Sequence, residues 1–295
     1  MPNPKSEIRN PHSEIRLGLL MRLARPAADH PYFAQDKFRP LVMAHRGGAG
    51  LWPENTMYGF KRAVDSEVDV LETEIRSTAD GVLVLVHDST VDRTTSGEGP
   101  VNGITLRELQ ALDAGFNWSS DGGRTFPFRG RGITVPTLAE VFTAFPNTRL
   151  NIDIKQVQPS LILPLCKTIH AFGMADKVMV ASFDSKVLKV FRRECPGVAT
   201  CLSPHEVMFF CLMNFVGLGA AYRTAAYALQ VPEYQGKLRV LTKRLVDTAH
   251  ILNLKVHAWT INETSDMRRL LNLGVDGIIT DYPDRLITLL GRTHQ

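Results

Sequence analysis

The stretch Val70–His87, VLETEIRSTADGVLVLVH, separates a hairpin from the parallel strands of the predicted sheet. It contains two apolar runs separated by RSTADG (76–81), which ends in an Asp-Gly turn signal. Such a short connection leaves no room for the helical crossover that joins parallel strands, so the two runs are expected to pair as an antiparallel hairpin. Only the first run then remains available to a parallel sheet.

Outside this hairpin, short apolar runs alternate with amphipathic segments, a pattern typical of parallel strands joined by helices. Counting both hairpin runs, nine strands are predicted, over 41–45, 68–75, 82–87, 149–155, 177–183, 198–203, 227–231, 255–261 and 276–281. Helices are predicted over 55–64, 137–145, 160–172, 184–193, 242–253, 265–274 and 284–292. Setting the second hairpin run aside leaves eight strands. This count favours a closed (β/α)₈ TIM barrel over an open sheet, although periodicity alone does not separate the two.

Length and composition allow one large domain as readily as two smaller ones. Of the 295 residues, 44% are apolar, which is enough for a single extensive core. The polar and weakly patterned residues 1–38 are expected to form a weakly structured tail, with a short helix over 14–24, and the barrel domain is expected over 39–292. Residues 89–135 are rich in turn signals and predict a long insertion after the hairpin. The formal net charge of +4 is spread along the chain without a basic block, so no nucleic-acid partner is expected.

Residues 204–230 form the most apolar segment and carry few charges. They predict either a core helix packed on the barrel or a lipid-facing contact with a membrane surface. No signal peptide and no spanning segment is expected, which favours a cytoplasmic location, peripheral to the membrane if this segment contacts lipid. The four cysteines, at 166, 195, 201 and 211, lack CxxC spacing and predict reduced thiols of a reducing compartment rather than a zinc site.

Acidic side chains follow two of the predicted barrel strands. Glu72 and Glu74 alternate along one strand and therefore share a face, and Asp153 occupies a strand that is expected to lie nearby. Buried carboxylates are costly unless they are paired or bind a metal. Three carboxylates without a Cys/His ligand cluster suggest a hard divalent cation, Mg²⁺ or Ca²⁺.

Basic side chains and two histidines join these acids at the carboxyl ends of the strands, where TIM barrels carry their chemistry. Arg46 and Lys155 suit phosphate oxygens. His45 and His87, on different strand ends, could provide a base and an acid across a reacting phosphorus. Phosphodiester cleavage is the chemistry that would use all of these groups.

Several motifs together resemble the glycerophosphodiester phosphodiesterase family: AHRGGAGLWPENT (44–56), LETEI (71–75), LVLVHD (83–88), the Arg-Thr-Thr and glycines of 93–99, and GVDGIITDYP (274–283). The stretch FTAFPNTRLNIDIK (142–155) is similar to the branch that includes lysophospholipase D enzymes. The resemblance implies a TIM barrel of the phospholipase C-like phosphodiesterase type and a metal-dependent phosphoric diester hydrolase.

The resemblance also implies roles for single residues. His45 and His87 match the catalytic histidines, as general base or nucleophile and general acid. Substrate-binding positions are Arg46, Lys155 and the aromatic Trp259, and metal-binding positions are Glu72, Glu74 and Asp153. Two of these depart from the commoner pattern, which has Asp where this chain has Glu74 and Glu where it has Asp153, so the identity and affinity of the metal are the properties in question.

The apolar segment 204–230 favours lysophospholipids as substrates, cleaved to a phosphomonoester and an alcohol. One alternative is hydrolysis of small soluble diesters to glycerol 3-phosphate. A second is a lyase, similar to phospholipase D toxins, that releases a cyclic phosphate. A third is a non-catalytic protein that binds lipid or phosphate.

Overall fold

Eight parallel strands form the centre of the molecule. The computed structural model describes residues 24–34 and 40–292. The strands are β1 (Leu41–Ala44), β2 (Val70–Ser77), β4 (Arg149–Ile154), β5 (Val178–Ala181), β6 (Ala199–Thr200), β7 (Ala228–Val231), β10 (Lys255–Ala258) and β11 (Gly277–Thr280). Each lies within or overlaps one of the predicted runs, and most are shorter than predicted.

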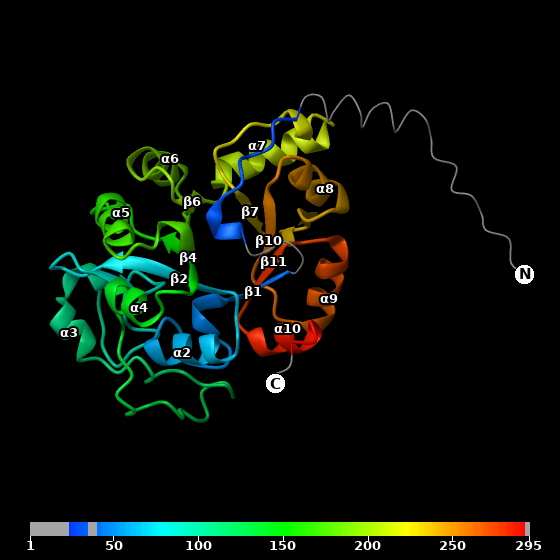
Figure 1. The fold of residues 1–295 in the computed structure, drawn as a ribbon. Helices are drawn as coiled ribbons and strands as arrows, with labels where there is room; N and C mark the ends of the chain where they lie inside the picture. Colours follow the sequence, from blue (N-terminus) through cyan, green and yellow to red (C-terminus); the bar gives the residue numbers. More distant parts are fainter. Residues whose placement is uncertain (1–23, 35–39, 293–295) are drawn as a thin grey trace, which may run out of the picture.

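The strand order closes a barrel. Neighbouring strands pair in the order β6-β5-β4-β2-β1-β11-β10-β7, and each of these pairs is parallel. An isolated parallel bridge between Cys201 and Ala228 joins the two ends of this series. Figure 1 shows the helices as a ring around the strands. The predicted (β/α)₈ TIM barrel is therefore confirmed.

The ring consists of seven predicted helices and one that the apolar segment 204–230 supplies. They are α2 (Met57–Asp65), α4 (Leu138–Ala144), α5 (Ile162–Ala171), α6 (Ser185–Glu194), α7 (Pro204–Phe215), α8 (Lys243–Ile251), α9 (Thr264–Leu273) and α10 (Pro283–Leu289). Side-chain caps start several of them: the Thr56 hydroxyl accepts a hydrogen bond from Gly59 N, and the Asp184 carboxylate accepts from Lys186 N. Because residues at the helix starts supply these caps, the observed helices begin close to where the sequence predicts them.

The hairpin and the insertion also match the prediction. β3 (Leu83–Leu85) pairs antiparallel with β2, with Ile75 opposite Leu85. The insertion that follows contains η3 (Val101–Gly103) and α3 (Leu106–Gln110). It buries apolar side chains against Val84 and Val86 of the hairpin, namely Val91, Val101, Leu109, Ala114, Phe128, Ile133 and Val135. In Figure 1 it forms the lobe beside α2 and α4. The insertion is therefore a packed unit that holds the strand end before it in place.

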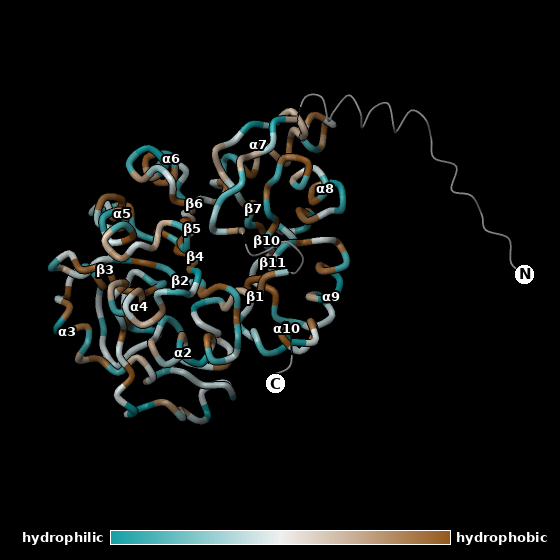
Figure 2. Tube along the Cα trace, viewed as in Figure 1, coloured by the Kyte–Doolittle hydropathy of each residue, from teal (hydrophilic) through white to brown (hydrophobic). Residues whose placement is uncertain are grey.

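Apolar side chains fill both faces of the barrel strands, because helices cover their outer side and neighbouring strands face their inner side. Figure 2 shows this apolar character along the central strands. Buried polar side chains at the strand ends, among them Glu72, Glu74, Asn151 and Asp153, are exceptions to this pattern. They mark one end of the barrel as a candidate site.

The N-terminal segment differs from the expectation of a weakly structured tail over 1–38. Residues 24–34 pack against the barrel: Ala27 N donates a hydrogen bond to Leu252 O at 2.8 Å, and Tyr32, in η1 (Pro31–Phe33), is buried. An apolar ring and a short capped turn in this segment explain why it packs. Residues 1–23, which include most of the helix predicted over 14–24, and residues 35–39 lie outside the described part of the chain.

α7, within segment 204–230, has one buried side, as a core helix has, and one exposed apolar side. Phe210 and Asn214 are buried against the barrel. The opposite side exposes large apolar side chains, Met208, Phe209, Leu212, Phe215 and Val216, of which Phe215 is 82% exposed. Within the described ranges, no helix is both long and apolar enough to cross a bilayer.

The prediction of reduced thiols is wrong for two of the four cysteines. Cys166 on α5 and Cys195 at the end of α6 form a disulfide across 29 residues of sequence, whereas Cys201 and Cys211 are free. Sequence spacing could not reveal the pair, because only the packing of α5 on α6 brings the two sulfur atoms together. Because two of the cysteines form a disulfide, the cysteines no longer favour a reducing compartment.

Candidate active site

His45 begins a short turn directly after β1, at the carboxyl end of the barrel. Its Nδ1–H donates to Asp281 Oδ1 at 2.6 Å, and its Nε2 lies 4.0 Å from Glu72 Oε2. Burial lowers the pKa of His45, but the Glu72 carboxylate and the bond to Asp281 outweigh burial, so the pKa is raised above its ordinary value. Asp281 thereby fixes the ring orientation and turns Nε2 toward the acidic cluster.

Arg46 lies at the centre of the acidic groups. Its backbone N–H donates to Glu72 Oε2 at 3.1 Å, its Nε to Glu74 Oε1 at 3.0 Å and its Nη1 to Glu54 Oε1 at 2.9 Å. A positive φ of 51° at Arg46 and glycines at 47 and 48 allow the tight turn that places these donors. Two of the three guanidinium nitrogens are thus anchored to carboxylates, and this orients the third.

Glu72, Glu74 and Asp153 share one buried corner. Parallel pairing of β2 with β4 sets Glu74 beside Asp153. Single donor atoms of His45, Glu72 and Glu74 all lie within 4.8 Å of one another. Burial and the neighbouring Glu74 raise the pKa of Glu72 to about 8. The ionised form of Glu72 is therefore unfavourable in this corner, first because it is buried and second because Glu74 lies beside it.

This corner fits a divalent cation. Asp153 Oδ2 accepts from Lys155 Nζ at 2.8 Å, but Asp153 Oδ1 is buried without a hydrogen-bond partner in the described part of the chain. Burial raises the pKa of Asp153 above its ordinary value. An unpartnered buried carboxylate oxygen beside two further carboxylates is the donor set that hard cations such as Mg²⁺ and Ca²⁺ prefer.

His87 follows β3, at the end of the second hairpin run. Its Nδ1–H donates to Asp88 Oδ1 at 2.6 Å, and Arg76 donates to the His87 carbonyl through Nε and Nη2. Although burial opposes it, the bonds from Arg93 and His87 lower the pKa of Asp88 to about 2. Both histidines therefore have Nδ1 held by an aspartate, which leaves Nε2 available for proton transfer.

An ionic chain connects the two histidine regions. Arg93, in the insertion, donates to Asp88 Oδ2 at 2.6 Å and to both Glu54 oxygens at 2.7 Å. Glu54 in turn accepts from Arg46. Sequence reasoning assigned no role to Arg93, Asp88 or Asp281. The aspartates could have been found from their places, one next to His87 and the other at the last strand end, but Arg93 depends on how the insertion folds back.

Trp259 and Lys155 lie on the rim of the site. Trp259 is partly buried and packs on inward-facing side chains of β1, β2 and β11. Its ring meets Phe183 edge-on at 5.8 Å between centroids, and Lys155 Nζ lies 4.8 Å from the Phe183 centroid. All eight predicted site residues thus fall at the carboxyl end of the barrel.

A TIM barrel with paired histidines, an arginine and a carboxylate cluster at this end belongs to the phosphodiesterase class of these folds. A family model, "Glycerophosphoryl diester phosphodiesterase family", matches residues 45–285. The chain belongs to the glycerophosphodiester phosphodiesterase family, whose members are phosphoric diester hydrolases.

Comparisons with individual proteins agree with this family assignment. The chain is 36% identical over 261 residues to a glycerophosphodiester phosphodiesterase of Caldanaerobacter subterraneus, covering 85% of this chain and 98% of the relative. It is 27% identical over 277 residues to a human lysophospholipase D, covering 85% and 86%. In structure it is similar to an Oleispira antarctica phosphodiesterase in complex with sn-glycerol-3-phosphate, with a TM-score of 0.69, 24% identity and coverage of 89% and 100%.

The raised pKa of Glu72 predicts a pH-dependent stability of the metal-free protein. Its ordinary pKa is 4.5 and its folded value is about 8. The folded state therefore binds this proton more tightly, so the contribution of Glu72 to stability is fully present below about pH 4.5 and is lost as the pH rises toward 8. Melting temperatures of chelator-treated protein should fall across this window, and a Glu72→Gln variant should flatten that fall. A wild-type profile without this decline would contradict the assignment.

Removing Arg93 from the ionic chain is expected to lower turnover and to leave the fold intact. Arg93→Met leaves Asp88 and Glu54 without their shared partner, so His87 loses part of its positioning. We expect turnover of glycerophosphocholine to fall by roughly 10- to 100-fold, since small misplacements of catalytic groups carry such costs. Arg107→Met, at an exposed arginine of α3, is the matched control. Equal activity of the two variants would show that Arg93 does not position the site.

Proposed function

We propose that the chain hydrolyses glycerophosphodiesters with His45 and His87 as its proton-transfer pair. The observation that carries this proposal is the arrangement of both histidines, each with Nδ1 bound to an aspartate at 2.6 Å and Nε2 available at the carboxyl end of the barrel. Arg46 and Lys155 bind the phosphate oxygens, and Trp259 lines the wall of the pocket.

As a general base, His45 accepts a proton from the attacking water, because its environment beside Glu72 favours the protonated ring. As a nucleophile, its Nε2 would instead bond to phosphorus while the P–O bond to the alcohol breaks, and water would then hydrolyse the N–P bond. His87 donates a proton to the departing alcohol oxygen, and the hydrogen bond from its Nδ1 to Asp88 orients the ring for that step. Glu72, Glu74 and Asp153 would hold one Mg²⁺ or Ca²⁺. When bound, this cation supplies positive charge that stabilises the phosphoryl oxygens.

The apolar rim of the site bears on which substrates the chain cleaves. We infer that lysophospholipids are substrates, cleaved to a phosphomonoester and an alcohol such as choline. The rim supports this because Phe183 is 63% exposed next to Trp259, and Val157 is also exposed after β4. An acyl chain that leaves the catalytic corner would meet these apolar groups. The name of the human relative, lysophospholipase D, agrees with this choice.

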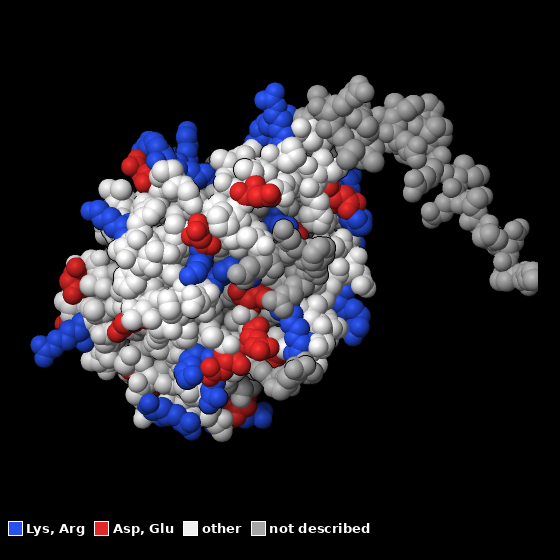
Figure 3. All heavy atoms as spheres, viewed as in Figure 1, with Lys and Arg blue, Asp and Glu red and all other residues white. Residues whose placement is uncertain are grey.

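The membrane is the expected source of such a substrate. α7 follows β6 directly, so its first turn starts at the same end of the barrel as the site. Its exposed apolar side chains would insert at a lipid surface. α6, which packs beside α7, carries the exposed basic residues Lys186, Lys189 and Arg193, which suit anionic headgroups. Figure 3 shows Lys and Arg side chains gathered over α6.

Small soluble diesters are the second candidate. The Caldanaerobacter relative is named a glycerophosphodiester phosphodiesterase, and the Oleispira structure holds sn-glycerol-3-phosphate. Phosphorus NMR of products from glycerophosphocholine and lysophosphatidylcholine separates the two candidates. Formation of lysophosphatidic acid supports the lipid substrate, glycerol 3-phosphate alone supports the soluble one, and a cyclic phosphate would replace hydrolysis by a lyase reaction.

Loss of either histidine predicts a large loss of activity. His45→Ala and His87→Ala should each lower turnover by about 10²- to 10⁴-fold, the usual contribution of a positioned acid or base. Circular dichroism and melting temperature should stay near the wild-type values. His205→Ala, at an exposed histidine of α7, is the matched control and should retain activity. Near-full activity of either site variant would refute its role.

Making the exposed face of α7 polar is expected to lower the turnover of a lipid substrate but not of a soluble one. The double substitution Leu212→Ser and Phe215→Ser removes two exposed apolar side chains that make up one stripe of α7. Turnover of lysophosphatidylcholine presented on anionic vesicles should fall several-fold, whereas turnover of glycerophosphocholine should not change. Leu163→Ser, at an exposed leucine of α5, is the control. Equal loss for both substrates, or none for the lipid, would remove α7 from the proposal.

A further inference from the structure

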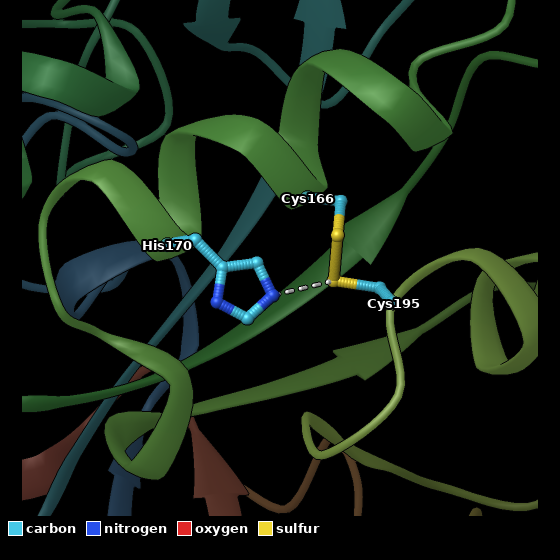
Figure 4. A group of neighbouring side chains, drawn as sticks. All are labelled: Cys166, His170 and Cys195. Carbon is cyan, nitrogen blue, oxygen red and sulfur yellow. Dashed lines mark hydrogen bonds between the residues drawn. A yellow bond between two sulfur atoms is a disulfide. The ribbon is translucent and has the colours of Figure 1, made fainter.

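Three side chains that can bind a metal, two cysteines and one histidine, meet where α5 packs on α6. Cys166 and His170 lie four residues apart on α5 and therefore share a face, and Cys195 ends α6. Their donor atoms all lie within 4.8 Å of one another. Figure 4 shows the His170 ring directed at the disulfide, with Nε2 3.7 Å from Cys195 Sγ.

The spacing of these donors suits a zinc ion. With Zn–S of about 2.3 Å and Zn–N of about 2.0 Å, a tetrahedral site separates sulfur and nitrogen ligands by roughly 3.5 Å. The distance from His170 Nε2 to Cys195 Sγ is already close to that value. The Cα atoms of Cys166 and Cys195 are 5.6 Å apart, so in the dithiol form rotation about the Cα–Cβ bonds can separate the sulfur atoms to ligand spacing.

The surroundings distinguish this cluster from the catalytic corner. The cysteines are buried between the helices, whereas His170 is exposed and leaves a path for a cation and a water ligand. Both helices run back from the carboxyl ends of β4 and β5, so Cys195 and His170 lie toward the amino end of the barrel, opposite the site. Two thiolates and an imidazole select soft or borderline cations, unlike the carboxylates of the catalytic corner.

We propose that Cys166, His170 and Cys195 form a Zn²⁺ site in the reduced protein, and that the disulfide is the oxidised state of the same site. Reduction by a small dithiol breaks the S–S bond, transfers two electrons and two protons to the cysteines, and leaves the dithiol as its own disulfide. Zn²⁺ then displaces the two thiol protons and binds both sulfur atoms and Nε2 of neutral His170. The ion would join α5 to α6 as the disulfide does.

Cobalt binding tests the proposal without reference to activity. Co²⁺ bound by thiolates has a sulfur-to-metal charge-transfer band in the near ultraviolet, which a carboxylate site lacks. Protein purified under reducing conditions should develop this band with one equivalent of Co²⁺ and lose it when Zn²⁺ is added. Protein with the disulfide intact should not develop it. Reduced protein with no band would overturn the proposal.

Variants of the exposed histidine keep the test independent of folding. His170→Ala should weaken binding by at least about ten-fold, since even outer partners of a metal ligand contribute that much. Cys166→Ser should remove the band. Cys201→Ser and Cys211→Ser, which change the two free cysteines, should retain it. Unchanged binding in His170→Ala, or loss in either free-cysteine variant, would assign the metal to other groups.

Discussion

The burial of three carboxylates at the carboxyl ends of β2 and β4 is the constraint on which the site depends. Register sets Glu74 beside Asp153, and alternation along β2 places Glu72 on the same face. Burying such charges without compensation is strongly unfavourable. Arg46 and Lys155 offset part of this cost, yet burial and the neighbouring Glu74 still raise the pKa of Glu72 to about 8. A bound divalent cation would offset more of the cost, and under the proposed function it would couple stability to catalysis at this corner.

The surrounding architecture maintains this corner. The turn after β1 places His45 and Arg46 beside the buried carboxylates. His87 follows the second strand of the hairpin. The insertion then connects both through Arg93, which binds Asp88 and Glu54 together. The apolar side chains of the insertion pack together and stabilise it. This packing also positions Arg93, which connects the two histidine regions.

Much of this could be predicted from the sequence, because the relevant signals are local. Alternation of apolar runs located the strands, the Asp-Gly turn separated the hairpin from the barrel, and strand-end positions gathered the site residues. The disulfide and the role of Arg93 could not be predicted, because both depend on contacts between segments far apart in the chain. Composition also could not decide how α7 divides its apolar residues, since Phe210 is buried and Phe215 is exposed in the same helix.

Calorimetric titration of Mg²⁺ and Ca²⁺ into the metal-free protein would show whether the buried carboxylates bind a cation. We expect the wild-type chain to bind one cation and both Glu74→Gln and Asp153→Asn to lose it, with Glu140→Gln, at an exposed acid of α4, as a control that binds normally. Binding that survives both site substitutions, or no binding by the folded wild-type chain, would contradict the claim that the buried carboxylates are a cation site.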